Sequence, residues 1–180
     1  MLLSGARHTA AHTGYNDTFR FVGPASGEVA DATWVAIDAL QLPDEKASVQ
    51  FLGRGMEREV LKALVGFRGA CRLQSTAGVI ATGNWGCGAF NGCPGVKALV
   101  QWAAASEAGV TRLQYHTWDD AATQEALTQL AALHARMSVG QLWTAAKRVA
   151  EAPQQHGLPA ASMRDDGRHF LDAVARLCTG

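Results

Sequence analysis

The order of apolar and polar side chains predicts strands in the first 40 residues. Residues 18–22 alternate with the period of a half-buried strand, and residues 33–37 form a second, mostly apolar run. The five residues 23–27 between these runs include two glycines and a proline, which is the composition of a turn. A further apolar run at 78–82 is rich in β-branched side chains and predicts a buried strand.

Helical periodicity begins at Met56 and is expected to end at Gly69. The apolar positions that define this helix are Val60, Leu61, Leu64 and Val65. Pro94 suits the first turn of a second helix, because a missing N–H costs nothing there, and that helix should end near Gly109. The alternating run 110–115 then predicts a strand. Strand, glycine-rich segment, helix and strand together predict a βαβ unit with a parallel strand pair and a right-handed crossover.

Three more helices are predicted in the second half of the chain. Asp119 or Asp120 can cap the first of them, whose apolar positions are Leu127, Leu130 and Leu133. Ser138 and Gln141 have the spacing of a capping box that opens the second. The third is expected at 168–177, after a loop at 151–168. The fold class is therefore α/β (α+β), with strands early and helices late.

Composition and charge exclude several classes of protein for this chain. A chain of 180 residues with 48% hydrophobic and 18% charged residues is typical of one globular domain. The 16 basic residues balance the 16 acidic ones, which argues against a general basic surface for DNA. No apolar run approaches a membrane span and no secretory signal is visible, so we expect an intracellular protein, cytoplasmic or nuclear, without a membrane partner. Four cysteines without a CxxC pair predict neither a disulfide scaffold nor a zinc site.

The glycines concentrate at 83–95, between the predicted strand and the helix that follows it. A backbone without Cβ atoms can approach a ligand closely, and its N–H groups beside a helix N-terminus suit a phosphate or diphosphate. The segment lacks the end of a P-loop, and its GxGxxxG spacing differs from the dinucleotide fingerprint. A tight packing turn is the alternative. Trp85 and Phe90 could stack on a base or ribose, or could fold back as core anchors.

Residues 81–90, with the sequence ATGNWGCGAF, closely resemble the central motif of the poly(ADP-ribose) glycohydrolases. Similar segments occur in the family's order on both sides, at 3–19, 35–40, 59–67, 97–101, 115–120 and 138–143. The resemblance covers residues 1 to about 150. We therefore expect residues 1–150 to form a poly(ADP-ribose) glycohydrolase-like macrodomain portion, and 151–180 a C-terminal loop and helix.

The resemblance implies a macrodomain, in which helices flank a mixed sheet and ADP-ribose lies in a cleft at the strand ends. It implies poly(ADP-ribose) or free ADP-ribose as the partner, and no cofactor or metal. The residues that correspond to the family's diphosphate-binding loop are Gly86, Cys87, Gly88 and Ala89.

Four further side chains carry roles that the resemblance implies. Tyr15 corresponds to the tyrosine that closes over the ligand, and Phe90 to the phenylalanine that orients the distal ribose. Trp118 stands where the family usually has a phenylalanine against the adenine, and it retains a stacking face. Asn84 matches a motif asparagine that we expect to shape the loop.

The family's catalytic motif, three glycines followed by Gln-Glu-Glu, does not occur in these 180 residues. Cleavage of a glycosidic bond needs an acid for the leaving oxygen and a base for water. We expect hydrolysis of ribose–ribose O-glycosidic bonds to ADP-ribose only where an upstream segment supplies the glutamates. The chain alone is expected to be inactive or very weak, with a macrodomain incomplete at its N-terminal side. A non-catalytic ADP-ribose-binding module and a decayed fragment are the alternatives.

Overall fold

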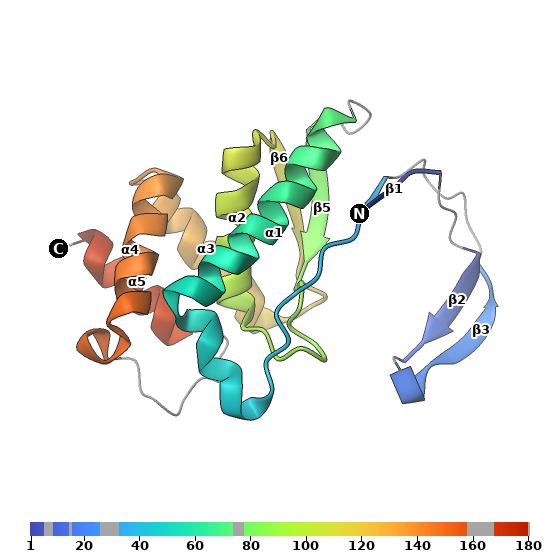
Figure 1. Cartoon of the computed structure of the whole chain (residues 1–180), viewed down its shortest axis with the longest axis horizontal. Helices are drawn as coiled ribbons and strands as arrows, with labels where there is room; N and C mark the ends of the chain where they lie inside the picture. Colours follow the sequence, from blue (N-terminus) through green and yellow to red (C-terminus); the bar gives the residue numbers. More distant parts are fainter. Residues whose placement is uncertain (6–8, 15, 26–32, 74–77, 158–167, 180) are drawn as a thin grey trace. The chain divides into compact units, whose positions relative to one another are not determined.

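The computed structural model describes residues 1–5, 9–14, 16–25, 33–73, 78–157 and 168–179 (Figure 1). They belong to two compact units, Met1–Ala36 and Ile37–Gly180. The sequence-based boundary between residues 150 and 151 differs from this division and stays a prediction.

The first unit contains two antiparallel strand pairs. Strand β1 (Leu2–Leu3) pairs with β4 (Trp34–Val35), and β2 (Ala10–Thr13) pairs with β3 (Arg20–Pro24). A short 3₁₀ turn at Asn16–Thr18 precedes β3, so this strand begins two residues later than the alternation predicts. Pro24, expected in a turn, instead ends the strand, a position where its missing N–H breaks no ladder.

None of the described residues of the first unit is fully buried. Phe21 and Val22 of β3 are each 64% exposed, and Trp34 of β4 is 53% exposed. A unit of this size with its large apolar side chains exposed has no core of its own among the described residues.

The second unit contains the predicted βαβ unit. Strand β5 (Val79–Gly83) leads through the glycine-rich loop to helix α2 (Pro94–Ala108) and then to β6 (Arg112–His116). The two strands are parallel, with Ile80 opposite Leu113 and Thr82 opposite Tyr115. Their carboxyl ends therefore lie at the same edge, which is where ligands bind in sheets of this class.

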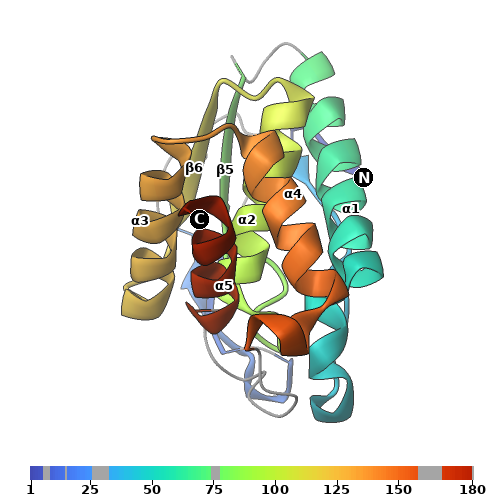
Figure 2. The same cartoon turned by 90° about the vertical axis from the view of Figure 1, so that its left-hand side faces the viewer.

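The remaining elements of this unit are helical. They are η2 (Asp44–Phe51), α1 (Gly53–Arg72), α3 (Ala121–His134), α4 (Val139–Glu151), η3 (Pro153–His156) and α5 (Arg168–Thr179). In Figure 1 helices α2 to α5 lie to the left of the β5–β6 pair, and Figure 2 shows α5, α2 and α4 from that side. Helix α2 occupies the centre, and its buried residues share one core with Leu130 of α3, Leu142 of α4 and Phe170 of α5.

Most helix ends follow the sequence signals. Pro94 is in the first turn of α2, and Gly109 ends that helix in the left-handed conformation with a φ of 74°. Asp120, not Asp119, caps α3, and Ser138 and Gln141 form both bonds of the capping box of α4. Gly69 does not end α1, which continues to Arg72 because a helical glycine weakens a helix without breaking it.

Helix α1 was predicted correctly, but only some of the apolar positions used to predict it, such as Val60, face the core. Leu61 and Val65 are 59% and 64% exposed. The buried stripe instead contains Met56, Glu59 and Phe67, together with small residues. The prediction failed here because a carboxylate was not expected to face inward.

The α/β class is confirmed. The strands of the described residues form three two-stranded sheets rather than the single mixed sheet that was expected. Asp165 and Asp166 lie outside the described residues.

Candidate functional site

The glycine-rich loop, residues 83–93, is a folded turn that only glycine can form at two positions. Gly86 has a φ of 76°, and a Cβ there would lie 2.5 Å from the Cβ of Ala39. A Cβ at Gly92 would lie 2.6 Å from the carbonyl oxygen of Gly86. Gly88 is different, because a Cβ there would meet no atom within 4 Å. Gly86 and Gly92 therefore shape the loop, whereas Gly88 borders open space.

Backbone hydrogen bonds fold the loop on itself. The bonds run from Trp85 N–H to Gly83 O (2.7 Å), Cys87 N–H to Asn84 O (3.0 Å), Asn91 N–H to Gly88 O (2.9 Å) and Gly92 N–H to Gly86 O (2.8 Å). The successive N–H groups of Gly88, Ala89 and Phe90 donate to no acceptor in the part of the chain that the structure describes. Gly88 and Ala89 are also exposed. Three adjacent N–H dipoles at the end of a strand can bind an anion.

Asn84 joins the loop to β6 and α3. Its Oδ1 accepts from the hydroxyl of Tyr115 (3.1 Å), and its Nδ2 donates to Asp120 Oδ2 (3.4 Å). The hydroxyl of Thr123 lies 3.4 Å from the same Oδ1 and donates its hydrogen to Asp120 Oδ2 across 2.5 Å. The Thr123 hydroxyl bond lowers the pKa of Asp120 below its usual value, with smaller contributions from backbone N–H groups and Asn84. Because its amide is committed to these partners, Asn84 acts on the loop's position.

Trp85 folds back into the protein. Its indole N–H donates to the carbonyl of Ile37 (3.2 Å), and its ring packs against the hydrophobic core. The ammonium of Lys97 lies 4.2 Å from the ring centroid, within the range of a cation–π contact. Of the two roles that the sequence left open for Trp85, the structure supports the anchor.

Cys87 and Phe90 are half-buried residues of the same loop. Burial raises the pKa of the Cys87 thiol far above its usual value, so it stays neutral at physiological pH and is a poor nucleophile. The carbonyl of Phe90 accepts from the N–H of Leu42 (3.1 Å), and the amide of Asn91 donates back to the Leu42 carbonyl (3.0 Å). The segment before η2 thus holds the far end of the loop.

Trp118 follows β6 and is 86% exposed, more than any other large apolar side chain described. It has a φ of 55° and Asp119 one of 60°, a left-handed conformation that bulky side chains rarely adopt. The turn is closed by the N–H of Asp120 on the carbonyl of Thr117 (3.1 Å). A Cβ at Gly83 would lie 3.5 Å from the indole nitrogen, so Trp118 stands beside the start of the glycine loop.

Tyr15 lies outside the described residues. Its predicted role therefore remains a prediction, as do the ligand contacts predicted for Asn84, Gly86, Cys87, Gly88, Ala89, Phe90 and Trp118.

The chain is similar in sequence to a protein family and to known proteins of Arabidopsis thaliana. A family model described as poly (ADP-ribose) glycohydrolase (PARG), Macro domain fold, matches residues 1–125. The chain belongs to the poly(ADP-ribose) glycohydrolase family. A probable poly(ADP-ribose) glycohydrolase 2 of Arabidopsis thaliana is 42% identical over 66 residues, which are 36% of this chain and 12% of the relative. Poly(ADP-ribose) glycohydrolase 1 of the same plant is 41% identical over the same lengths. The match thus spans about an eighth of the length of these curated relatives.

The family match includes the glycine loop and Trp118, and it ends within α3. Helices α4 and α5 lie beyond it, although they share the core of α2. Among the described residues no helix is long and apolar enough to cross a membrane. No group of three or more His, Cys, Asp and Glu side chains in that part of the chain could hold a metal ion.

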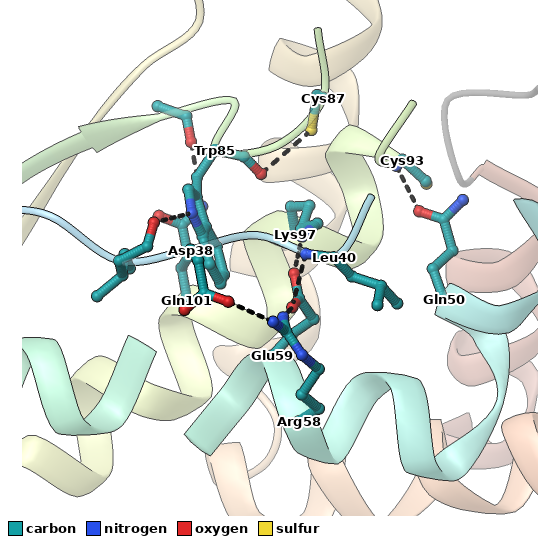
Figure 3. A network of polar contacts seen from close by, with 12 residues as sticks. Asp38, Leu40, Gln50, Arg58, Glu59, Trp85, Cys87, Cys93, Lys97 and Gln101 are labelled. Atoms are coloured by element: carbon teal, nitrogen blue, oxygen red, sulfur yellow. Dashed lines mark hydrogen bonds and ion pairs between the residues drawn. The ribbon is translucent and has the colours of Figure 1, made fainter. Parts of the chain in front are cut away.

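Sequence reasoning missed one pair of charged residues in this region. The side chains of Lys97 on α2 and Glu59 on α1 are 1% and 2% exposed, and they form an ion pair next to the glycine loop (Figure 3). The signal was present, because Lys97 adjoins the apolar run Ala98–Val100 and Glu59 follows Met56 on one helix face. A charge in an apolar stripe indicates a buried partner.

Proposed function

We propose that this member of the poly(ADP-ribose) glycohydrolase family binds the ADP-ribose unit of poly(ADP-ribose) at the carboxyl ends of β5 and β6. The observation that carries the proposal is the row of three N–H groups at Gly88, Ala89 and Phe90. They donate to nothing within the described residues and border open space at Gly88. A diphosphate offers the acceptors that such a row needs.

The other predicted residues fit around a diphosphate in this position. Gly86, Cys87, Gly88 and Ala89 would surround it, and Phe90 would pack on the distal ribose. Trp118 would stack on the adenine, which gives a reason for an exposed indole on a left-handed backbone. Tyr15 would close over the ligand. Asn84 would hold the loop in place through its bonds to Tyr115 and Asp120.

Hydrolysis is a separate part of the proposal. The family reaction cleaves the ribose–ribose bond with an acid that protonates the leaving oxygen and a base that activates water. The 180 residues contain neither the three-glycine sequence nor Gln-Glu-Glu. We therefore expect this chain to bind ADP-ribose with little or no turnover, and to need the missing carboxylates for the family activity.

Isothermal titration of the 180-residue chain with ADP-ribose tests the binding. AMP is the matched control, because it keeps the adenine and one phosphate and lacks the diphosphate and the distal ribose. Saturable binding of ADP-ribose that exceeds the binding of AMP is expected. Equal affinity, or no binding by a chain that melts cooperatively, would contradict the proposal. Incubation of the same preparation with poly(ADP-ribose) measures release of ADP-ribose, and rapid release would overturn the expected inactivity.

A further inference from the structure

Lys97 and Glu59 form a buried ion pair in the core of the second unit. Glu59 Oε2 accepts from the ammonium of Lys97, while Glu59 Oε1 accepts from the guanidinium of Arg58 and from the N–H of Leu40 (3.1 Å). Both carboxylate oxygens of Glu59 thus accept hydrogen bonds, and the carboxylate holds the Lys97 ammonium in one position. Helices α1 and α2 are joined through this pair.

The pair is the inner end of a row of alternating charges. The guanidinium of Arg58 forms ion pairs with the carboxylates of both Asp38 and Glu59. The Nζ of Lys62 lies 2.7 Å from Oδ1 of Asp38. Figure 3 shows Lys97 bonded to Glu59, Glu59 to Arg58, and Arg58 to Asp38, which lies beside Trp85. Asp38 is 61% exposed, so the row connects the loop to the surface. Stability of the core alone does not explain why charged residues occupy these two positions. Two apolar side chains of similar volume often stabilise a core as well as a buried ion pair does, or better.

The ammonium of Lys97 lies directly beneath the glycine loop. It is 4.2 Å from the centroid of Trp85, and a Cβ at Gly86 would lie 3.1 Å from it. A Cβ at Gly92 would lie 3.0 Å from the Cε of Lys97. The loop therefore wraps around the end of this side chain, and its shape at Gly86 and Gly92 depends on a lysine that stays in place.

We propose that Lys97, held by Glu59, is a positioning residue for the bound diphosphate. It supports the turn at Gly86 and places a positive charge behind the N–H groups that face the anion. This inference rests on the proposed function and adds to it, because it makes affinity depend on a group that does not touch the ligand. Because little water screens it in a partly desolvated site, a positive charge can attract a diphosphate several ångströms away without touching it.

The charge of Lys97 can be removed by pH. Burial, followed by the positive charge of Arg58, lowers the pKa of Lys97 to about 8. The charged form is therefore present below about pH 8 and is lost as the pH rises through that value. Among the described residues, Glu59 and Arg58 face it from α1, and the loop presents the Trp85 ring. ADP-ribose affinity should fall through the same pH range.

The test replaces the pair by neutral residues of similar shape, in the double variant Glu59→Gln, Lys97→Met. Its matched control is Glu57→Gln, Lys147→Met, which makes the same changes in an exposed ion pair (2.7 Å) between α1 and α4. Cooperative melting is checked for both, and ADP-ribose affinity is measured by titration from pH 6.5 to 9.5. At pH 7 we expect the first variant to bind about tenfold more weakly than the wild type, and the control to bind as the wild type does.

The pH series separates positioning with charge from a simple loss of structure. The ratio of wild-type to variant affinity should fall as the pH rises through 8, because Lys97 then loses its charge, whereas a purely structural defect would keep the ratio constant. A constant ratio, or an unchanged affinity in the variant, would overturn the inference and leave the proposed function intact. A variant that fails to melt cooperatively is replaced by Lys97→Arg, which keeps the charge and should retain affinity above pH 8. Loss of affinity at pH 9 in a folded Lys97→Arg would overturn the inference. Absence of wild-type binding would overturn the proposed function and this inference together.

Discussion

Asn84 and Asp120 are bonded to each other, with the Asn84 Nδ2 donating to the Asp120 Oδ2 across 3.4 Å. The first belongs to the glycine loop after β5, and the second caps α3 after β6. Trp118 is held by the turn that Asp120 closes. The loop proposed for the diphosphate and the side chain proposed for the adenine are therefore positioned by one polar cluster.

Removal of this amide should destabilise the protein. Asn84→Ala leaves the half-buried hydroxyl of Tyr115 without its acceptor, which should lower the free energy of unfolding by about 1–3 kcal/mol, while Thr123 keeps its 2.5 Å bond to Asp120. Urea unfolding of the variant and the wild type measures this difference in free energy. Gln124→Ala, which removes an exposed amide from α3, is the control and should cost about 0.5 kcal/mol or less. If the two substitutions lowered the free energy of unfolding equally, the hydrogen bonds around Asn84 would contribute nothing to stability beyond those of an exposed amide.

Two glycines in open space allow a matched test of the loop. Neither Gly88 nor Gly53 has an atom within 4 Å of a Cβ position, and neither has a positive φ. Gly88→Ala and Gly53→Ala should both fold. The methyl group at 88 would occupy space next to the anion, so we expect about tenfold weaker ADP-ribose binding for that variant alone, or 1.4 kcal/mol. Titration of both variants checks this, and equal affinities would place the diphosphate elsewhere.

Trp118 provides a test of stacking. Trp118→Ala should weaken ADP-ribose binding by about 1–3 kcal/mol, the usual range for one base on an aromatic ring, with little effect on the melting temperature because the indole is 86% exposed. Trp118→Phe keeps a stacking face and should retain most of the affinity. Titration with ADP-ribose measures both variants. If phenylalanine and alanine were equally damaging, another contact of the indole would have to be responsible.

The Asp120 carboxylate predicts a loss of stability in acid. Its hydrogen bonds, led by that from Thr123, lower its pKa in the folded protein below the ordinary 3.8. A depressed carboxyl pKa stabilises the fold above pH 3.8, and that contribution is lost as the pH falls below it. Asp120→Ala, which removes the cap, should cost about 1 kcal/mol at pH 6. Urea unfolding of both proteins at pH 6 and at pH 3 should show the difference shrinking in acid, and a constant difference would contradict this account.

The βαβ unit was predictable because its signals are local. Pro94 begins α2, Gly109 ends it in a left-handed conformation, and the alternation at 110–115 gives β6 within two residues. The cap at Asp120 was predicted as one of two neighbours, since side-chain chemistry alone does not distinguish Asp119 from Asp120. The family was predicted from residues 81–90 and from similar segments on both sides of them, and the comparison confirms it. The roles of the site residues stay predictions.

What the sequence could not provide depends on contacts between distant segments. Glu59 was not expected on the buried face of α1, because its partner Lys97 lies 38 positions further along the chain. The role of Asn84 needed the positions of Tyr115 and Thr123, which adjoin it only after β5 and β6 have paired. The anchoring of Trp85 likewise depends on a carbonyl at Ile37 that spacing alone does not reveal.

The contact between Gly86 and Ala39 also restricts how the gene can change. A methyl group at position 86 would overlap the one already present at position 39, with 2.5 Å between the two carbons. A larger side chain at 39 would add atoms on the Cβ that already lies closest to Gly86. Inherited variation at these two sites should therefore stay confined to small residues, and a library of random variants selected for ADP-ribose binding should recover glycine at 86 and glycine or alanine at 39.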